Sequence, residues 1–389
     1  MKKSLCKKTM PKKLKIAMLF SSDASSAGGV QEHVYHLSKG LEKKGHHVAV
    51  FGTGKNILPF SNYQSVGQVF PVPSLNGNWG NILLPYSDKK IDALVRNTDY
   101  DLWHIHEPYL PAFSWQIIKE SPLPKVATFH TAWNNNSVLN MFNPFLPLFK
   151  NTFSKNVEGA IFVSEIVRKR WRHLCARRVF QRKIIHGVDR EIFYPLEYKT
   201  DRNRISILFL ARLVSRKGPQ YLLKAMIELI KKYPDIRLDV VGDGMDRQKF
   251  EQFANEKKIK DNVFFRGEIV GDKRVSYYQR ADIFCAPYAD EAFGLTVLEA
   301  MACGCPIVGF KNESFKEMLK NYPGQNLLVK QKDVKALTKA LEKLIVDDGL
   351  RKELSDWCVK ESQKYGWDRI ITETEVFYRQ VLNHPDFDY

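Results

Sequence analysis

The sequence has few cysteines and no long apolar run, and each absence excludes a class of protein. Six cysteines in 389 residues are too few for a disulfide scaffold of this size, and none stands in a Cys-x-x-Cys pair. No stretch approaches the ~20 apolar residues that a membrane span needs. The apolar run behind the N-terminal lysines, residues 16–20, is shorter than a signal-peptide core. We therefore expect a cytoplasmic protein with reduced thiols.

The sequence also has fewer acidic than basic residues, and the imbalance differs between the two halves of the chain. The sequence has 60 Lys and Arg against 43 Asp and Glu, a formal net charge of +17. Residues 1–200 hold 28 basic and 14 acidic residues, whereas residues 201–389 hold 32 and 29. The first half therefore carries a positive field that attracts nucleic acid or an anionic lipid surface. The charge alone does not choose between them.

Short apolar runs alternate with helical patterns along both halves of the chain. In the first half the runs predict strands at residues 15–20, 47–51, 102–105, 126–129, 160–163 and 183–185. In the second half they predict strands at residues 205–210, 238–241, 263–265, 283–286 and 306–308. This alternation indicates an α/β protein with two Rossmann-like, doubly wound parallel-sheet domains. Ligands of such domains bind at the carboxyl ends of the strands, here in a crevice between the domains. The polar stretch 197–204 is the expected linker, which gives domains of residues 1–196 and 203–366.

The segment from Glu291 to Pro306 is the most informative one. We expect a helix to begin near Gly294, with Glu291 in the loop before it and Glu299 inside it. The start of a helix offers unpaired N–H groups and a positive dipole end to a phosphate. Two carboxylates placed in this way suit the hydroxyl groups of a ribose and a hexose on either side of a diphosphate. On spacing alone, a solvated helix start with a coincidental pair of acids is equally consistent.

A second segment, Leu210 to Gly218, places two cations directly after a predicted strand. Arg212 and Lys217 can clamp a diphosphate, the arginine as a bidentate fork and the lysine as a point charge. They would also neutralise the charge that develops on a leaving group. Taken alone, this segment fits a solvated turn better.

Together, these motifs resemble the retaining glycosyltransferases of the GT-B fold. The Glu-x7-Glu and Arg-x4-Lys-Gly segments, Val241 to Gly244, and Gly28-Gly29 occur in the order and spacing typical of that group, which includes sucrose synthases and phosphatidylinositol mannosyltransferases. The resemblance spans residues 15–382 and implies two domains facing a central cleft. It implies that Glu299 binds the donor ribose and Glu291 the transferred sugar, while Arg212 and Lys217 hold the diphosphate. The further donor contacts that it implies are Gly28, Gly29, Gly242, Phe293, Gly294 and Leu295.

Two more segments, residues 103–108 and 126–131, most resemble the phosphatidylinositol mannosyltransferases and related lipid glycosyltransferases. The resemblance implies that His130 lies beside the reacting carbon of the donor sugar, as a catalytic residue with Glu291, Arg212 and Lys217. His106 and Glu107 are open between a cleft wall and a structural turn, because Pro108 favours a turn.

The sequence departs from the family pattern at two places. Ala211 replaces the usual glycine before the diphosphate arginine, and Ile185-His-Gly-Val-Asp189 replaces the usual Pro-Asn-Gly-Val-Asp signature. Neither departure removes a charged group, so they bear on fine specificity rather than on activity.

The resemblance also implies a mechanism without a metal ion or a resident cofactor. No Asp-x-Asp motif stands where a divalent cation would be needed beside the diphosphate segments. We expect front-face transfer with retention at the sugar, from a GDP- or UDP-linked donor. The final segment, residues 367–389, resembles the helix that crosses back to the first domain in this family.

A basic segment points to the acceptor. Residues 168–183 contain eight Lys or Arg and no acidic residue, with Val167, Trp171, Leu174 and Val179 at helical spacing on the other side. This pattern predicts a basic amphipathic helix that docks on anionic lipid headgroups. A domain helix that packs its apolar stripe inward is the alternative. The predicted acceptor or membrane contacts here are Arg168, Lys169, Arg170, Trp171, Arg172, Arg177 and Arg178. Residues 75–79 resemble an acceptor loop, with Asn76 and Trp79 as its contacts.

The sequence therefore predicts transfer of a hexose, of the mannose or glucose type, to a hydroxyl of a membrane lipid such as a phosphatidylinositol-like glycolipid. The enzyme would be peripheral on the cytoplasmic membrane face. One alternative is a glycosyltransferase of polysaccharide or lipopolysaccharide assembly. Another is a non-catalytic protein that binds nucleotide sugars or polyanions. No nucleic-acid recognition motif is present, so we expect no nucleic-acid partner.

Overall fold

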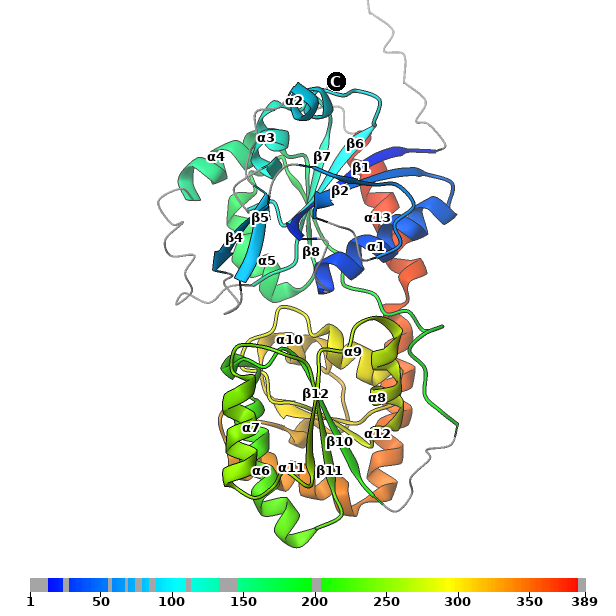
Figure 1. Ribbon diagram of the computed structural model, residues 1–389. Coiled ribbons are helices and arrows are strands. Elements are labelled where there is room, and N and C mark those ends of the chain that lie inside the picture. Colours follow the sequence, from blue (N-terminus) through cyan, green and yellow to red (C-terminus); the bar gives the residue numbers. More distant parts are fainter. Residues whose placement is uncertain are drawn as a thin grey trace, which may run out of the picture.

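The computed structural model describes residues 13–23, 28–54, 58–66, 69–73, 79–83, 89–109, 113–132, 146–197 and 204–383. Its strands form two large parallel sheets in two lobes, which Figure 1 shows one above the other. The N-terminal lobe contains the first sheet, and the C-terminal lobe contains the second. The predicted fold class, two Rossmann-like domains, is confirmed.

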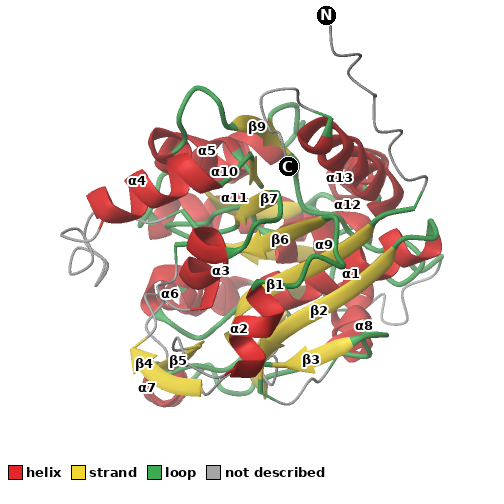
Figure 2. Cartoon of the chain, turned by 90° about the horizontal axis from the view of Figure 1, so that it is seen from above, coloured by secondary structure: helices red, strands yellow, loops and turns green. Residues whose placement is uncertain are grey.

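The sheet of the N-terminal lobe has seven strands in the order β3-β2-β1-β6-β7-β8-β9, and all neighbouring pairs are parallel. Several of these strands lie side by side in Figure 2. The strands are β1 (Lys15–Asp23), β2 (His47–Thr53), β3 (Tyr63–Ser65), β6 (Leu102–His106), β7 (Lys125–Phe129), β8 (Gly159–Phe162) and β9 (Phe180–Lys183). A separate antiparallel pair consists of β4 (Val69–Pro73) and β5 (Trp79–Leu83). The helices of this lobe are α1 (Gly29–Lys43), α2 (Lys89–Val95), α3 (Phe113–Glu120), α4 (Leu146–Asn156) and α5 (Glu165–Trp171).

Side chains of β1 alternate between two cores, one on each face of this sheet. Ala17 and Leu19 pack in one core, whereas Ile16, Met18 and Phe20 pack in the other. Because helices cover both faces, the central strands are buried on both sides and appear in the sequence as nearly continuous apolar runs.

The C-terminal lobe has a six-stranded parallel sheet in the order β12-β11-β10-β13-β14-β15 around one core. Its strands are β10 (Ser206–Leu210), β11 (Arg237–Val241), β12 (Val263–Gly267), β13 (Ile283–Ala286), β14 (Ile307–Phe310) and β15 (Leu328–Val329). Its helices are α6 (Pro219–Lys232), α7 (Arg247–Glu256), α8 (Val275–Arg280), α9 (Leu295–Ala302), α10 (Glu313–Met318), α11 (Val334–Val346) and α12 (Asp348–Ser362).

The last helix, α13 (Trp367–Leu382), returns to the N-terminal lobe, as the resemblance implied. It appears in red beside α1 in Figure 1. Ile370, Ile371 and Phe377 are buried in the core that α1 shares with one face of the first sheet. At Gly40 of α1, an added Cβ would lie 1.9 Å from Cδ1 of Ile371, so the missing side chain is what lets the two helices approach closely.

The basic segment differs from its prediction. Helix α5 ends at Trp171, and a 3₁₀ turn (Arg172–Leu174) and the edge strand β9 follow it, so residues 168–183 do not form one amphipathic helix. Strand β9 begins three residues before the predicted 183–185. Over the part of the chain that the structure describes, no helix is both long and apolar enough to span a bilayer.

Candidate functional site

The two lobes meet at loops that follow their central strands. Oγ of Ser164, at the start of α5, donates a hydrogen bond to the backbone oxygen of Ala292 in the loop after β13, over 2.6 Å. The ring of Phe293 lies 5.1 Å from that of His186. An added Cβ at Gly29 would lie 2.6 Å from Cδ1 of Leu295. The Gly-rich start of α1 therefore packs against the start of α9, and both predicted donor elements line one cleft.

Lys217 and Glu291 form a salt bridge at the carboxyl ends of β10 and β13. Gly218, with φ of 75°, follows Lys217, and an added Cβ there would lie 2.1 Å from the backbone oxygen of Pro287. Only glycine allows these two loops to approach so closely. Burial lowers the pKa of Lys217. Burial would raise the pKa of Glu291, but the charge and hydrogen bond of Lys217 outweigh it and lower that pKa.

Arg212 is exposed at the end of β10. Gly242 lies behind it with φ of 133°, and an added Cβ there would lie 2.0 Å from the backbone oxygen of Ala211. Gly242 therefore has a packing reason for its conformation, and its role as a donor contact stays a prediction.

Helix α9 begins after Gly294, whose φ of 96° would strain other residues. The predicted helix start near Gly294, with Glu299 inside the helix, is confirmed.

Glu299 is buried and contacts two side chains of its own lobe. Its carboxylate accepts hydrogen bonds from Arg274 over 2.8 Å and from the hydroxyl of Tyr278 over 2.7 Å. The same arginine donates to Glu32 of α1 over 2.8 Å, so it bridges the lobes. Burial raises the pKa of Glu32 although Arg274 opposes this effect. Sequence reasoning missed Arg274 and Tyr278, because neither lies in a motif of recognisable spacing. Glu32 lies three residues after Gly29, so its place beside the predicted donor contacts could have been inferred from the sequence.

Four buried histidines from four parts of the N-terminal lobe form a hydrogen-bonded chain. Nδ1 of His106 lies 2.9 Å from Nε2 of His130, and Nδ1 of His130 lies 3.3 Å from Nε2 of His186. Nδ1 of His186 in turn lies 3.0 Å from Nδ1 of His33, on α1. Burial lowers the pKa of His186 to about 3 and those of the other three well below their ordinary value. These imidazoles are therefore neutral near pH 7.

His106 and Glu107 were predicted with two alternatives, and both side chains are buried at the end of β6, beside His130. Glu107 has φ of 57°, in the left-handed region. Its carboxylate accepts hydrogen bonds from the hydroxyl of Thr131 over 2.7 Å and the backbone N–H of His130 over 3.4 Å. Burial raises the pKa of Glu107 to about 7. This carboxyl group is therefore held rigidly where β6 and β7 end.

The predicted acceptor and membrane residues are dispersed. Trp171 is only 2% exposed, donates from Nε1 to the backbone oxygen of Thr131 and stacks on Tyr109, so it packs inward and is not a membrane contact. Arg168 forms a salt bridge with Glu165 on the same helix. Among the predicted contacts, four basic residues are exposed: Lys169, Arg172, Arg177 and Arg178. Arg170 is half-buried. Asn76 lies outside the described residues, and Trp79 begins β5 with a side chain that is likewise not described.

Lys169 and Lys183 also line a pocket with Glu313, Lys316 and Glu317 of the C-terminal lobe. Part of the basic segment therefore faces the other lobe rather than open solvent. Arg172 and Arg177 are exposed outside this pocket, and so is Arg178, which donates from Nε to the backbone oxygen of Ser154.

Comparison with known proteins identifies two adjacent family matches. Residues 27–191 match the family described as Glycosyltransferase Family 4, and residues 194–358 match Glycosyl transferases group 1. The phosphatidyl-myo-inositol mannosyltransferase of Mycolicibacterium smegmatis is 29% identical, over 95% of this chain and 94% of that protein. An uncharacterised glycosyltransferase of Haemophilus influenzae is 26% identical, over 91% of this chain and 97% of that protein.

Solved structures share the fold. Sucrose-phosphate synthase of Thermosynechococcus elongatus has a TM-score of 0.73 at 22% identity and covers 94% of this chain and 99% of its own. HepE of Anabaena, in complex with UDP and glucose, has a TM-score of 0.73 at 16% identity and covers 93% and 99%.

Proposed function

We propose that this chain, which belongs to the GT-B glycosyltransferases, transfers a hexose from a nucleoside diphosphate sugar to a hydroxyl of a membrane lipid such as a phosphatidylinositol-like glycolipid. The observation that carries the proposal is the convergence of Arg212, Lys217 and Glu291 on the start of α9, at the carboxyl ends of β10 and β13. Two cations beside a helix N-terminus are suited to a diphosphate.

In the proposed reaction, the diphosphate would bind Lys217 and Arg212, and Glu291, the salt-bridge partner of Lys217, would accept a hydroxyl group of the transferred sugar. The donor ribose would bind Glu299, whose carboxylate Arg274 and Tyr278 hold in position. As the bond to the sugar breaks, the two cations neutralise the leaving diphosphate, so the reaction requires no metal ion there. His130 would lie beside the reacting carbon, and transfer would proceed with retention.

The proposed acceptor rests on the relatives and on surface charge. The relative from Mycolicibacterium smegmatis is a phosphatidyl-myo-inositol mannosyltransferase, which favours an inositol lipid as the acceptor and mannose as the sugar. The HepE structure holds UDP and glucose, so UDP-linked glucose is the second candidate for the donor. Arg172, Arg177 and Arg178 are exposed on the N-terminal lobe and provide the positive surface for an anionic membrane. On this basis the enzyme is peripheral to the cytoplasmic membrane face.

Thermal unfolding with excess UDP, GDP or ADP, each with and without EDTA, tests the donor site. A ligand at about 100 times its dissociation constant adds ~2.7 kcal/mol of stability, which shifts the midpoint by several degrees. We expect one nucleotide to produce this shift whether or not EDTA is present. No shift with any nucleotide would contradict the donor site, and a shift abolished by EDTA would contradict metal independence.

Transfer to vesicles tests the acceptor. We expect radiolabelled hexose to enter the lipid fraction of vesicles that contain phosphatidylinositol but not of pure phosphatidylcholine vesicles. Replacing Arg172, Arg177 and Arg178 together by Ala should reduce vesicle binding and transfer, whereas replacing the exposed Lys231 and Lys232 of the C-terminal lobe should not. Transfer only to water-soluble glycans would contradict the lipid acceptor and favour polysaccharide assembly.

A further inference from the structure

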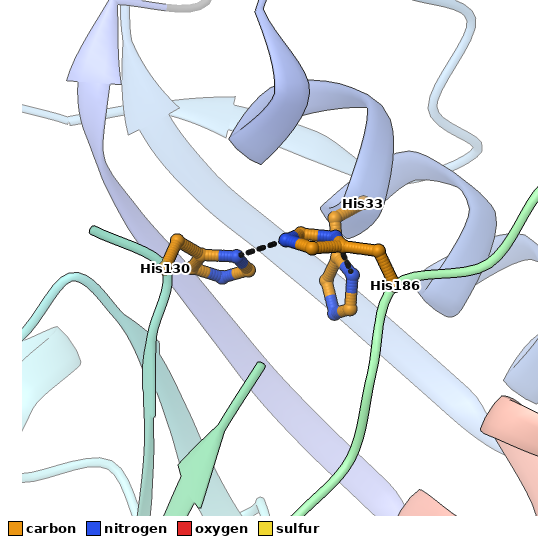
Figure 3. A group of neighbouring side chains, drawn as sticks. All are labelled: His33, His130 and His186. Atoms are coloured by element: carbon orange, nitrogen blue, oxygen red, sulfur yellow. Dashed lines mark hydrogen bonds between the residues drawn. The ribbon is translucent and has the colours of Figure 1, made fainter. Parts of the chain in front are cut away.

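Three of the buried histidines converge from separate elements of the N-terminal lobe. His33 comes from α1, His130 from the end of β7, and His186 from the connection after β9. Figure 3 shows their rings turned toward one another. Each offers one nitrogen such that the three atoms lie within 4.8 Å of one another. Three separate elements of the lobe thus bring together three nitrogen atoms of the kind that bind metal ions.

Binding of a single transition-metal ion sets the spacing that these three nitrogens would need. Nitrogens bound to a tetrahedral Zn²⁺ at about 2.0–2.1 Å lie roughly 3.3 Å apart. His186 makes two contacts of this size, but through opposite ring nitrogens: its Nδ1 lies 3.0 Å from Nδ1 of His33, and its Nε2 lies 3.3 Å from Nδ1 of His130. An ion bound by one of these two nitrogens would replace one hydrogen bond, and the third ring would turn to bring in its nitrogen, which lies within 4.8 Å. Neutral imidazole is the form that binds metals, and it suits Zn²⁺, Cu²⁺ and Ni²⁺ rather than Mg²⁺ or Ca²⁺.

The surroundings provide an orienting partner and an opening. Nε2 of His130 contacts Nδ1 of His106, which leaves Nδ1 of His130 for an ion and fixes its ring, as outer partners do in metal sites. His33 and His186 also line a pocket between the lobes together with Glu32 and Asp189. This pocket provides a path for an ion and its water, and the carboxylates offset part of the added charge.

We propose that His33, His130 and His186 bind a transition-metal ion of the Zn²⁺ class, through one nitrogen each, with water as the fourth ligand on the pocket side. This site is separate from the diphosphate site and is not needed for the proposed reaction. Because His130 is also assigned to the transferred sugar, we expect a bound ion to inhibit transfer. That consequence rests on the proposed function, whereas the binding measurement does not.

The test uses the full chain after dialysis against a chelator and titrates it with Co²⁺, which reports coordination through its visible spectrum. We expect one equivalent of Co²⁺ to give the intense visible bands of four-coordinate cobalt with nitrogen and oxygen ligands, and Zn²⁺ to displace it. His33→Gln and His186→Gln should each lower affinity by more than the roughly 10–100-fold that loss of an outer partner costs. His47→Gln, at the exposed start of β2, should leave affinity unchanged.

The spectrum of the unsubstituted chain keeps the proposal falsifiable even where a variant fails to fold. The weak absorption of six-coordinate Co²⁺ would overturn the proposal. Thiolate-to-cobalt charge-transfer bands would place the ion on the cysteines and would overturn it too. If a folded His33→Gln variant bound Co²⁺ with unchanged affinity, that result would also overturn the proposal. A chain that binds Co²⁺ as expected but shifts with no nucleotide would retain this site and lose the proposed function, so the two failures are distinguishable.

Discussion

At the scale of single residues, the electrostatics of the cleft depend on charged groups that hold each other in place. Lys217 and Glu291 are mostly buried, with side chains 11% and 17% exposed, and each needs the charge of the other. A diphosphate offers Lys217 a stronger partner and releases Glu291. Charged groups prepared in this way stabilise a developing negative charge at little cost of reorganisation.

Lys217→Ala should lower kcat/KM for transfer by about 100- to 1000-fold, the usual effect of losing one group that stabilises a developing anion. The matched control is Lys231→Ala, because Lys231 pairs with Glu228 on an exposed face of α6. Steady-state kinetics measure the effect, and circular dichroism verifies the fold. Glu299→Ala should have the same result. Wild-type activity in both variants would contradict the donor assignment.

The buried carboxyl group of Glu107 leads to a prediction about how the stability of the fold depends on pH. Burial raises the pKa of its carboxyl group from 4.5 to about 7, so the folded state binds a proton that the unfolded state has lost between these values. The contribution of Glu107 to stability is therefore full below pH 4.5, falls as the pH rises to about 7, and is constant above that. The total loss is about 3 kcal/mol.

Glu107→Gln removes this titration while keeping an acceptor for Thr131. Relative to the wild type, the variant should gain stability between pH 5 and pH 8. Urea unfolding of both proteins at the two pH values measures this difference, in which the titration of the histidines largely cancels. A constant difference across that range would show that Glu107 has an ordinary pKa.

At the scale of elements, the sequence predicted most of the strands because parallel strands covered on both faces are nearly continuous apolar runs. β6 is buried at all five positions and was found within one residue. Strands β3 and β15 escaped prediction because they have only three and two residues. The basic segment was misassigned because α5, a 3₁₀ turn and β9 together mimic helical spacing.

The contact between α1 and α13 gives a prediction at this scale. In Gly40→Val, the new side chain would collide with Ile371, whose Cδ1 lies 1.9 Å from the position of an added Cβ. We expect a loss of about 1–3 kcal/mol, the usual cost of overpacking a core, measured by urea unfolding. Ile371→Ala in the same chain should recover part of that loss. Gly349→Ala of α12, where the nearest atom to an added Cβ lies 3.5 Å away, should be neutral or slightly stabilising.

The candidate site shows a similar division between what the sequence reveals and what it does not. Arg212, Lys217, Glu291 and Glu299 were candidates from their places after predicted strands or in a predicted helix, and the family resemblance, not the spacing alone, gave them their predicted roles. Arg274 was not a candidate, because its importance arises only when α1 of the other lobe presents Glu32 to it. Contacts between lobes leave no local pattern in the sequence.

At the scale of the whole molecule, a few polar contacts hold the lobes together across a site that must admit a nucleotide. Arg274 bridges Glu32 and Glu299, and Glu317 of α10 pairs with Lys183 and accepts from the backbone N–H of Glu165. The pair of Lys183 with Glu317 is partly exposed and contributes only about 0–1 kcal/mol, whereas Arg274 and Glu32 form a more buried pair, with side chains 12% and 26% exposed. Relative motion of the lobes is the ordinary expectation for such an interface.

The double variant Glu32→Gln/Glu317→Gln should therefore open the lobes without unfolding either one. Each substitution removes the negative charge from one ion pair between the lobes, and both leave Glu299, Lys217 and Arg212 in place. We expect a larger radius of gyration in small-angle X-ray scattering and an unchanged circular dichroism spectrum. In 1 M NaCl the wild type should change in the same direction, because the screening length falls to about 3 Å. Glu342→Gln, which removes an exposed pair with Lys232 inside the C-terminal lobe, is the control. If the scattering of the double variant matches that of the wild type, apolar contacts such as Gly29 on Leu295 hold the lobes closed instead.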